Sequence, residues 1–432
     1  MVPGGRAVTE RIQIMKKLET PRRVVVTGMG AISPVGLDVE AMMAALYAGR
    51  GGVARIERFD PSGLTTQIAA EVRDFDPTRY MDKKDAKRAD RFAQFAIAAS
   101  REAVAQSGLQ GSDIDPTRIG VLIGSGIGGI ETFEIQHQAL LERGASRVSP
   151  FFVPMMISDM ASGLVSMTYG FKGPNFCAVS ACASAANAIG TAYLLIQAGQ
   201  AEAFVTGGAE ATITPMTMAG FCSMKAMSER NDDPATASRP FDAGRDGFVM
   251  GEGAGILVLE ELASARRRGA KILGEVVGFG MTGDAYHMTA PSPDGEGAAR
   301  AMQGALRMAG VEPSAVDYIN AHGTSTPYND KNETQAIKAV FGTHARKLKV
   351  GSTKSMVGHL LGASGGLEAV VSVHVLGSGK VPPTINQIEP DPECDLDYIA
   401  NRAAVCDVRH ALSNSFGFGG HNVSLLFKRH ME

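Results

Sequence analysis

The chain has 432 residues, of which 44% are hydrophobic and 20% are charged, and its mean hydropathy is +0.00. These values predict a globular protein with a large buried core, built either from two or three domains or from one large α/β unit. The formal net charge of −3 excludes a general affinity for nucleic acid or for anionic membranes. No apolar run reaches the length of about 18 residues that a membrane-spanning helix needs.

The five cysteines form neither a CxxC pair nor the spacing of a zinc ribbon: Cys177, Cys182, Cys222, Cys394 and Cys406. An odd number in a chain of this length favours a reducing, cytoplasmic location without a disulfide framework. We interpret residues 1–21 as a flexible extension or tag, because the charged stretch at 1–20 lacks the apolar core of a signal peptide.

Strands and helices alternate along the chain. In the first part, apolar runs predict strands at 23–30, 119–123, 203–206 and 255–259, and helices at 38–48, 82–106 and 182–198. Residues 149–156 are expected to form an apolar loop, and residues 228–253 a long structured surface loop. The second part predicts strands at 276–281, 316–321, 348–351, 411–414 and 422–427, and helices at 297–309, 332–341 and 360–376. Because the same order recurs after about residue 270, we predict an α/β duplication of layered sheets and helices, with halves at 22–270 and 271–432.

Cys182 opens the Ala-rich helix predicted at 182–198, which ends before Gly199. A thiol at a helix start meets unpaired N–H groups and the positive end of the helix dipole, and both favour a thiolate. The sequence therefore predicts a candidate nucleophile. The alternative is a small buried cysteine in a tightly packed Ala-rich element, and this stretch alone does not separate the two.

Three other stretches place reactive side chains directly after predicted strands. His322 lies in Asn-Ala-His-Gly-Thr-Ser-Thr, and Lys354 and His359 lie in Lys-Ser-Met-Val-Gly-His. The third stretch, 414–421, is a turn whose glycines free backbone N–H groups to face an anion. Strand ends in α/β sheets project side chains into crevices, so these are candidate site residues. Taken one at a time, each histidine is equally compatible with a structural role.

Three further patterns suggest other chemistries. Residues 124–129, Gly-Ser-Gly-Ile-Gly-Gly, match the dinucleotide fingerprint, but no second strand ending in an acidic residue follows about 20 residues later. Residues 362–366 match the GxSxG of serine hydrolases, but Ser364 is predicted inside a helix and not on a strand-to-helix elbow. A zinc site would need Cys182 and the two histidines, and no HExxH or comparable local pair supports it.

Together, the reactive stretches resemble those of the beta-ketoacyl-acyl-carrier-protein synthases. The matching motifs are Ser-Ala-Cys-Ala-Ser around Cys182, His-Gly-Thr-Ser-Thr-Pro from His322, the stretch 354–359 and Asn-Ser-Phe-Gly-Phe-Gly-Gly at 414–420. They occur in the family's order, and the likeness runs from about residue 22 to residue 428. It is closest to the type II elongating condensing enzymes of bacterial fatty-acid synthesis. The resemblance implies a thiolase-like fold, in which two βαβαβαββ halves form five αβαβα layers, usually as a homodimer.

The resemblance also implies a decarboxylative condensation that lengthens an acyl chain by two carbons, with no cofactor and no metal. Cys182 would hold the acyl chain as a thioester after transfer from an acyl carrier protein. His322 and His359 would stabilise the enolate that forms as malonyl-carrier protein loses carbon dioxide. Lys354, paired with Glu368, would orient and polarise the two histidines.

Further residues take roles that the resemblance implies. Backbone N–H groups of Cys182 and Phe418 would form the oxyanion hole, and Phe418 would gate the cysteine. Basic residues at helical spacing would receive the acidic carrier protein, although such charge runs are often plain solvated faces. The remaining implied roles are pantetheine contacts for Thr324 and Thr326, an acyl-pocket lining or a plain core role for Ile127 and Phe221, and carrier-protein docking for Lys83, Lys84, Lys87 and Arg88.

Three alternatives stay open. The ketosynthase of a type II polyketide or other specialised lipid pathway would carry the same motifs. A catalytically silent partner subunit is disfavoured by the complete set of cysteine and two histidines. A cysteine-dependent thioester hydrolase is disfavoured because no acidic group is evident that would make either histidine a base for water.

Overall fold

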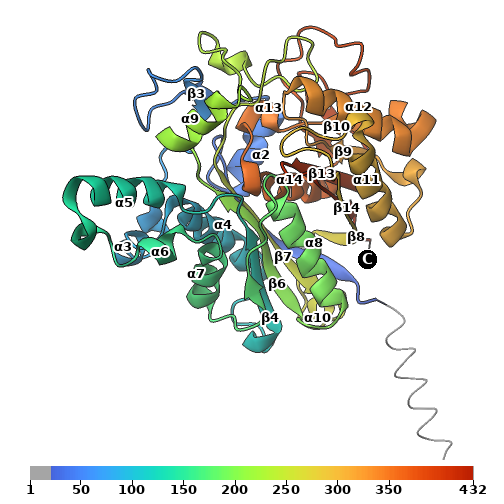
Figure 1. Ribbon diagram of the computed structural model, residues 1–432. Helices are drawn as coiled ribbons and strands as arrows, with labels where there is room; N and C mark the ends of the chain where they lie inside the picture. Colours follow the sequence, from blue (N-terminus) through green and yellow to red (C-terminus); the bar gives the residue numbers. More distant parts are fainter. Residues whose placement is uncertain (1–20, 432) are drawn as a thin grey trace, which may run out of the picture.

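The computed structural model describes residues 21–431, and its centre is one continuous mixed sheet of ten strands (Figure 1). In spatial order the strands are β10 (Lys349–Gly351), β9 (Tyr318–Asn320), β13 (His410–Gly417), β14 (His421–Lys428), β8 (Gly274–Gly283), β1 (Val24–Ile32), β7 (Gly253–Glu261), β6 (Ala203–Glu210), β4 (Ile119–Gly124) and β5 (Asn175–Phe176). Two separate two-stranded sheets pair β2 (Val53–Arg55) with β3 (Ile68–Ala70) and β11 (Lys380–Val381) with β12 (Ala404–Val405). The extension predicted at the N-terminus lies outside the described residues, apart from its last position.

The central sheet consists of two five-stranded halves with the same topology. When the strands are numbered in chain order within each half, both halves have the spatial order third, second, fourth, fifth, first. The halves join where β1 pairs antiparallel with β8, from Val24↔Val276 to Val26↔Gly274. The predicted duplication is therefore confirmed. We retain residue 270 as the proposed boundary between the halves.

Helices form three layers around the two halves of the sheet (Figure 1). α4 (Arg91–Ser107) and α7 (Met160–Tyr169) cover the outer face of the N-terminal half, and α11 (Glu296–Ala309) and α12 (Pro327–Phe341) cover the outer face of the C-terminal half. α8 (Ser184–Gln197) and α14 (Ser364–Ser378) lie between them and share one core with strands of both halves. These are the five αβαβα layers that the resemblance implies. The other longer helices are α2 (Val39–Tyr47), α5 (Ile130–Arg143), α9 (Pro215–Ser223) and α10 (Leu262–Arg267).

A glycine on the first strand of each half shows how closely the outer layers pack. On β1, a Cβ at Gly30 would lie 1.9 Å from the Ala99 carbonyl oxygen of α4. On β8, a Cβ at Gly280 would lie 1.9 Å from the Ala301 carbonyl oxygen of α11. Only glycine, which has no Cβ, allows a strand and a helix to approach at this distance. Each half therefore packs its outer helix against a glycine of its first strand, although the sequences of the two halves differ.

Two helix predictions need correction. Residues 82–106 form two helices, α3 (Lys83–Ala86) and α4, because Asp90 leaves the helical path and caps α4 by accepting the backbone N–H of Phe92 at 3.3 Å. Residues 149–156, predicted as a loop, contain the short helix α6 (Phe152–Met156). Across residues 21–431, no helix combines the length and the apolar character needed to cross a membrane.

The stretch 228–253 is only partly a surface loop, contrary to the prediction. Its residues 237–242 and 247–253 are buried. Its polar groups find partners inside the protein: Asp242, for example, accepts the backbone N–H groups of Ile388 and Glu389 at 2.6 and 2.7 Å. A polar segment can be buried when its groups are paired in this way, and composition alone does not reveal the distant partners.

Candidate active site

The C-terminal half brings its reactive side chains together at the ends of three parallel strands. β9 pairs parallel with both β10 and β13, so the carboxyl ends of the three meet at one edge of the sheet. His322 follows β9, Lys354 begins the short helix α13 (Lys354–Val357) after β10, and Phe418 lies in the turn between β13 and β14. His359 follows α13, and its backbone N–H donates to the Val249 carbonyl at 2.7 Å. The predicted position at the strand ends is confirmed.

Cys182 lies in a tight turn before α8 and not on the helix. α8 begins at Ser184, so the predicted start at residue 182 is wrong by two residues. Ala181 has a φ of +50°, a left-handed conformation that a residue with a Cβ rarely adopts. Ser184 holds the turn closed, because its hydroxyl accepts the Ser180 N–H at 2.9 Å and donates to the Ala181 carbonyl at 2.7 Å.

The two histidine rings meet beside the sulfur. His359 Nε2 lies 3.2 Å from Cys182 Sγ, and His359 Nδ1 lies 2.9 Å from the hydroxyl of Ser364. Ser364, predicted inside a helix, is the first residue of α14. The centroids of the His322 and His359 rings are 5.3 Å apart, with the rings nearly perpendicular. Burial, reinforced by the charge of Lys354, lowers the pKa of both histidines well below 6.5. Both rings are therefore neutral at neutral pH, with one donor and one acceptor nitrogen each.

Lys354 is buried together with a carboxylate partner. Its side chain is 2% exposed, and Nζ pairs with Glu368 of α14 as the resemblance implies. Nζ also donates to the His322 carbonyl oxygen at 2.6 Å and lies 3.5 Å from His322 Nδ1. A lone buried ammonium would be costly, and these acceptors offset that cost. A donor at Nδ1 also leaves the Nε2–H of His322 as the free donor of that ring.

The structure corrects the expected ionisation of Cys182. Burial raises the pKa of its thiol to about 12, although the charge of Lys354 and the backbone N–H of Phe418 act in the opposite direction. The prediction of a thiolate counted the helix start but not the burial, and the cysteine is only 7% exposed. Cys182 is therefore a thiol at neutral pH, hydrogen-bonded to a neutral His359.

We expect alkylation of Cys182 by iodoacetamide to accelerate about tenfold per pH unit from about pH 7 to about pH 10. Only the thiolate reacts, and its fraction rises tenfold per unit below the pKa. Intact mass spectrometry along a pH series measures the rate, and Cys182→Ala corrects for other thiols such as Cys177, whose pKa burial raises to about 11. A rate that levels off near pH 8 would show that the thiol pKa is not raised.

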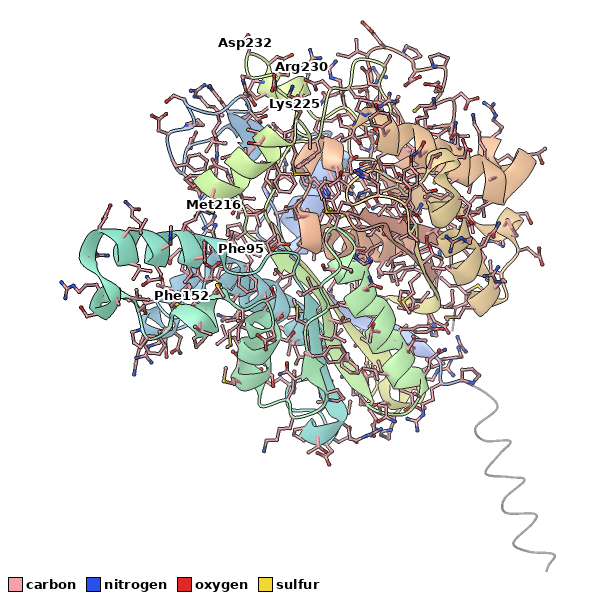
Figure 2. The ribbon with its side chains drawn as sticks, in the orientation of Figure 1. Phe95, Phe152, Met216, Lys225, Arg230 and Asp232 are labelled. Atoms are coloured by element: carbon pink, nitrogen blue, oxygen red, sulfur yellow. The ribbon has the colours of Figure 1, made fainter. Side chains whose placement is uncertain are left out.

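A pocket of about 410 Å³ opens over these groups. Of the residues given roles by the resemblance, Cys182, Phe221, His322, Thr324, Thr326, His359 and Phe418 line it. The Thr324 and Thr326 hydroxyl oxygens are 2.9 Å apart. Ile127 is not among the lining residues and is 38% exposed. Lys225, on the loop after α9, also lines the pocket. Figure 2 shows it at the top of the view, just below Arg230.

The glycine-rich stretch 124–129 faces an acidic side chain of the protein itself. This side chain is that of Glu210, which accepts the Gly126 N–H at 2.6 Å and the Ser125 hydroxyl at 2.8 Å. Glu210 also accepts the Gly362 N–H of the C-terminal half at 3.0 Å, so these anion-binding N–H groups are already occupied. Within residues 21–431, no group of three or more His, Cys, Asp or Glu side chains is arranged to hold a metal ion.

Two carboxylates of α12 support the site and were missed in the sequence. Glu333 is buried and accepts the backbone N–H groups of His322 and Gly323, both at 2.8 Å. Asp330, one turn earlier, accepts the N–H of Thr324 at 3.0 Å. A sequence signal for this support exists: Asp330 and Glu333 are three positions apart in the helix that directly follows the His322 motif. Residues at this spacing share one face of a helix, so both carboxylates can face the segment that precedes the helix.

The four docking candidates lie together on and just after α3: Lys83, Lys84, Lys87 and Arg88. All four are exposed, whereas Ala86 between them is buried. The guanidinium of Arg88 covers the ring of Phe151 at 4.4 Å. The cluster is accessible to an acidic partner.

Known proteins are similar to this chain in both fold and sequence. The models of the beta-ketoacyl synthase N-terminal and C-terminal domains match residues 21–265 and 273–387. The 3-oxoacyl-[acyl-carrier-protein] synthase 2 of Synechocystis sp. is 57% identical over 409 residues, which are 95% of this chain and 98% of that protein. The crystal structure of a beta-ketoacyl synthase from Burkholderia phymatum is 40% identical, with a TM-score of 0.88 over 95% of this chain and 100% of that one. A type II PKS ketosynthase, solved with its acyl-carrier protein, is 33% identical at the same TM-score and coverage.

The layered duplication, with a cysteine facing histidines from the other half, is that of a thiolase-like acyltransferase. The two domain models account for most of the sequence, and the Synechocystis protein matches it almost from end to end. The chain belongs to the beta-ketoacyl synthase family.

Proposed function

We propose that the enzyme is an elongating 3-oxoacyl-[acyl-carrier-protein] synthase of fatty-acid synthesis, which condenses a Cys182-bound acyl chain with malonyl-carrier protein. The observation that carries the proposal is the 3.2 Å contact between Cys182 Sγ and His359 Nε2, with the His322 ring adjacent, inside one pocket. The name of the 57% identical Synechocystis relative supports the same activity. Each catalytic group in the proposed mechanism is a side chain or backbone group of this chain.

In the first half-reaction, the Cys182 sulfur attacks the carbonyl carbon of an acyl-carrier thioester. Neutral His359 accepts the thiol proton at Nε2 and passes it to the departing thiol of the carrier, so a carbon–sulfur bond forms as another breaks. The backbone N–H groups of Cys182 and Phe418 are both close enough to the sulfur to lower its pKa. This supports the proposal that they stabilise the tetrahedral oxyanion.

In the second half-reaction, His322 and His359 donate hydrogen bonds from Nε2 to the malonyl thioester carbonyl. The carbon–carbon bond to the carboxylate breaks and carbon dioxide leaves. The electron pair of that bond stays on the thioester and forms an enolate, which the two donors stabilise. The enolate carbon attacks the acyl group and releases Cys182 as a thiolate, which takes up a proton. The Ser364 hydroxyl can donate or accept, so it satisfies His359 Nδ1 in both half-reactions.

The proposal is tested by supplying acyl- and malonyl-carrier protein and following carbon dioxide and the carrier-bound product. We expect one equivalent of carbon dioxide per condensation and a 3-oxoacyl product two carbons longer than the acyl donor. Release of free fatty acid instead would assign the site to thioester hydrolysis.

Ser364→Ala is expected to lower condensation about tenfold, because it leaves the buried Nδ1 of His359 without a partner. The matched control is Ser372→Ala on the same helix, since Ser372 is equally buried but donates to the Glu368 carbonyl. Steady-state rates with carrier-bound substrates give the comparison. Equal rates for the two variants would remove Ser364 from the mechanism.

We further propose that the basic cluster after residue 82 docks the acyl carrier protein. Replacing Lys84 and Lys87 together by glutamate should raise the KM for malonyl-carrier protein about tenfold at low salt, because two attractions become repulsions. Replacing Arg266 and Lys271 by glutamate makes the same charge change in and just after α10, which lies away from α3 at the junction of the two halves (Figure 1). A similar rise in KM for both pairs would assign the effect to net charge alone.

We also propose a cytoplasmic homodimer. β5 is the last strand of the central sheet, and both of its residues are exposed. Phe176 on this edge is 40% exposed and Met167 on the neighbouring helix α7 is 68% exposed. An unpaired edge strand beside apolar side chains suits pairing with a second copy about a two-fold axis. Light scattering should give twice the chain mass of 45.3 kDa.

The second candidate is a ketosynthase of a type II polyketide or specialised lipid pathway. The fold likeness to the type II PKS ketosynthase favours it, with a TM-score of 0.88. Its 33% identity is well below the 57% of the Synechocystis synthase, which favours fatty-acid elongation. Repeated condensation without intervening reduction would support the polyketide role.

A further inference from the structure

We propose that Arg245 positions the two threonine hydroxyls that bind the pantetheine arm of the substrate. The inference rests on the proposed function, which gives Thr324 and Thr326 that task. Both threonines line the pocket, whereas Arg245 is not among its lining residues. Arg245 therefore acts as a positioning residue, through the backbone of the segment 323–327 that joins the His322 motif to α12.

The segment 323–327 has a backbone that needs support from outside. Gly323 has a φ of +37° and Ser325 a φ of +68°, so two left-handed residues stand two positions apart, and Ser325 carries a Cβ. Such conformations persist only where surrounding groups hold them. The Ser325 hydroxyl accepts the Arg239 N–H at 3.0 Å, and the Ser325 carbonyl accepts the Gly247 N–H at 3.1 Å. The stretch 239–247 thus grips the segment from one side.

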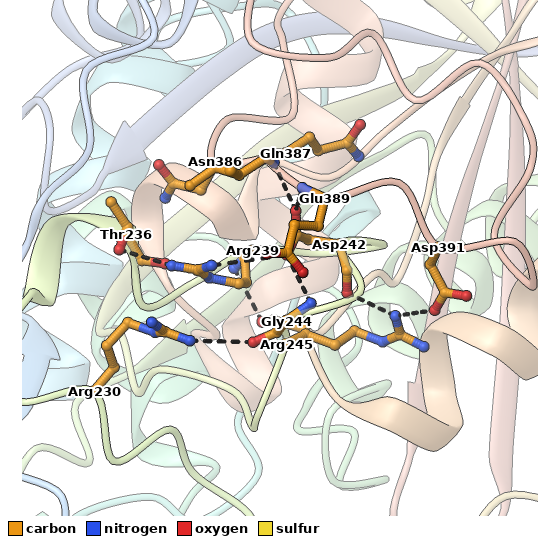
Figure 3. Close-up of polar contacts among 12 residues, drawn as sticks. Arg230, Thr236, Arg239, Asp242, Gly244, Arg245, Asn386, Gln387, Glu389 and Asp391 are labelled. Atoms are coloured by element: carbon orange, nitrogen blue, oxygen red, sulfur yellow. Dashed lines mark hydrogen bonds and ion pairs between the residues drawn. The ribbon is translucent and has the colours of Figure 1, made fainter.

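Arg245 supplies the side-chain part of this grip, and Figure 3 shows its contacts with Asp242 and Asp391. Its side chain is only 6% exposed; Nε donates to the Thr326 carbonyl at 3.3 Å, and one terminal nitrogen donates to the Pro327 carbonyl at 3.1 Å. The other terminal nitrogen is anchored by the Asp391 carboxylate at 2.5 Å and the Asp242 carbonyl at 2.7 Å. The guanidinium therefore links the end of the segment 323–327 to Asp242 and Asp391.

Asp330 extends this hold to the first threonine. It is fully buried, and its carboxylate accepts the N–H groups of Thr324 at 3.0 Å and Phe241 at 2.8 Å. Arg245 Nε lies 3.8 Å from the same carboxylate. Thr326 is thus held directly and Thr324 through Asp330, and their hydroxyl oxygens are kept 2.9 Å apart. Two adjacent hydroxyls can bind the amide groups of a pantetheine arm as donor and acceptor.

Lysine cannot replace this arginine. All three guanidinium nitrogens are used, on acceptors that lie in different directions, and a planar fork reaches them in one fixed geometry. An ammonium on a flexible stem would keep the charge beside Asp330 and Asp391 but lose the fork. Both Arg245→Lys and Arg245→Met should therefore impair the hold on the threonines.

The test compares two acyl donors that carry the same acyl chain: an acyl-pantetheine thioester, which has the whole arm, and an S-ethyl thioester, which lacks both amide groups of the arm. We expect both Arg245 variants to lose at least about tenfold in kcat/KM for Cys182 acylation by the pantetheine donor, mainly through KM. With the shorter donor the loss should stay below about twofold. If the thermal midpoint of Arg245→Met shows that this variant folds poorly, the comparison is made with Arg245→Lys alone.

Arg268→Met is the matched control. Arg268 is also a largely buried arginine in an ion pair: its side chain is 10% exposed, it donates to the Glu260 carboxylate at 2.8 and 2.6 Å, and it forms no hydrogen bond to 323–327 in the described chain. It should change neither donor by more than about twofold. A second control combines Arg245→Met with Thr324→Ala and Thr326→Ala, where the arginine change should add no further loss.

Equal losses with both donors, or a full additional loss without the threonine hydroxyls, would overturn the proposal and leave Arg245 a general structural role. A wild-type enzyme that is not acylated by either donor would instead overturn the proposed function, so the two failures are distinguishable.

Discussion

Cys182→Ala is expected to reduce condensation to background and to end acylation of the enzyme. The acyl chain has to be held while malonyl-carrier protein enters, and Cys182 is the only thiol of the described chain that lines the pocket. Without it no thioester forms, and the enolate has no acyl carbon to attack. The measurement is product formation from labelled malonyl-carrier protein, followed in parallel with the mass of the enzyme.

Two further variants sharpen this prediction. Cys182→Gln should retain release of carbon dioxide from malonyl-carrier protein, because the histidine pair is intact and the amide can occupy the acyl position. Cys177→Ala removes a half-buried thiol five positions earlier and should retain full condensation. Condensation that persists in Cys182→Ala would exclude Cys182 as the acyl carrier.

His322→Ala is expected to slow malonyl decarboxylation by about 10²–10³-fold. It removes one of two preorganised donors aimed at the developing enolate oxygen, and loss of such a donor in a water-poor site has this magnitude. The rate should be measured in the Cys182→Gln background, where acylation plays no part. Because the pKa of His322 is well below 6.5, the wild-type ring stays neutral as the pH rises from about 6.5 to about 8, and its contribution should stay constant.

His374→Ala is the control for this experiment. His374 is a half-buried histidine of the C-terminal half; its ring is hydrogen-bonded to the Tyr47 hydroxyl at 3.1 Å and does not line the pocket. Its loss should leave decarboxylation within about twofold of the parent. A loss below about tenfold for His322→Ala would assign the enolate to other groups.

Much of this molecule is predictable from local pattern. Strands such as β4 and β7 are runs of apolar residues buried on both faces, and their length and composition identify them. The stretches around His322, Lys354 and His359 follow predicted strands, so their position at the edge of a sheet could be inferred. The spatial strand order could not, because it depends on pairing between distant segments.

The chemistry of Cys182 shows what the sequence does not contain. Its surroundings include residues more than 170 positions away: His359 contacts the sulfur, and the backbone N–H of Phe418 lowers the thiol pKa that burial raises. The support from Asp330 and Glu333 depends on α12 folding back over the segment it follows. In both cases the interacting residues are close in space, but no local sequence pattern indicates that they are in contact.

The central claim, that Cys182 carries the acyl chain, is tested most directly by mass spectrometry of the enzyme after incubation with acyl-carrier protein alone. We predict a mass increase of one acyl group, located by peptide analysis to Cys182, which disappears when malonyl-carrier protein is added and 3-oxoacyl product forms. An acyl group on another residue, or condensation without any acyl-enzyme on the path to product, would contradict the claim.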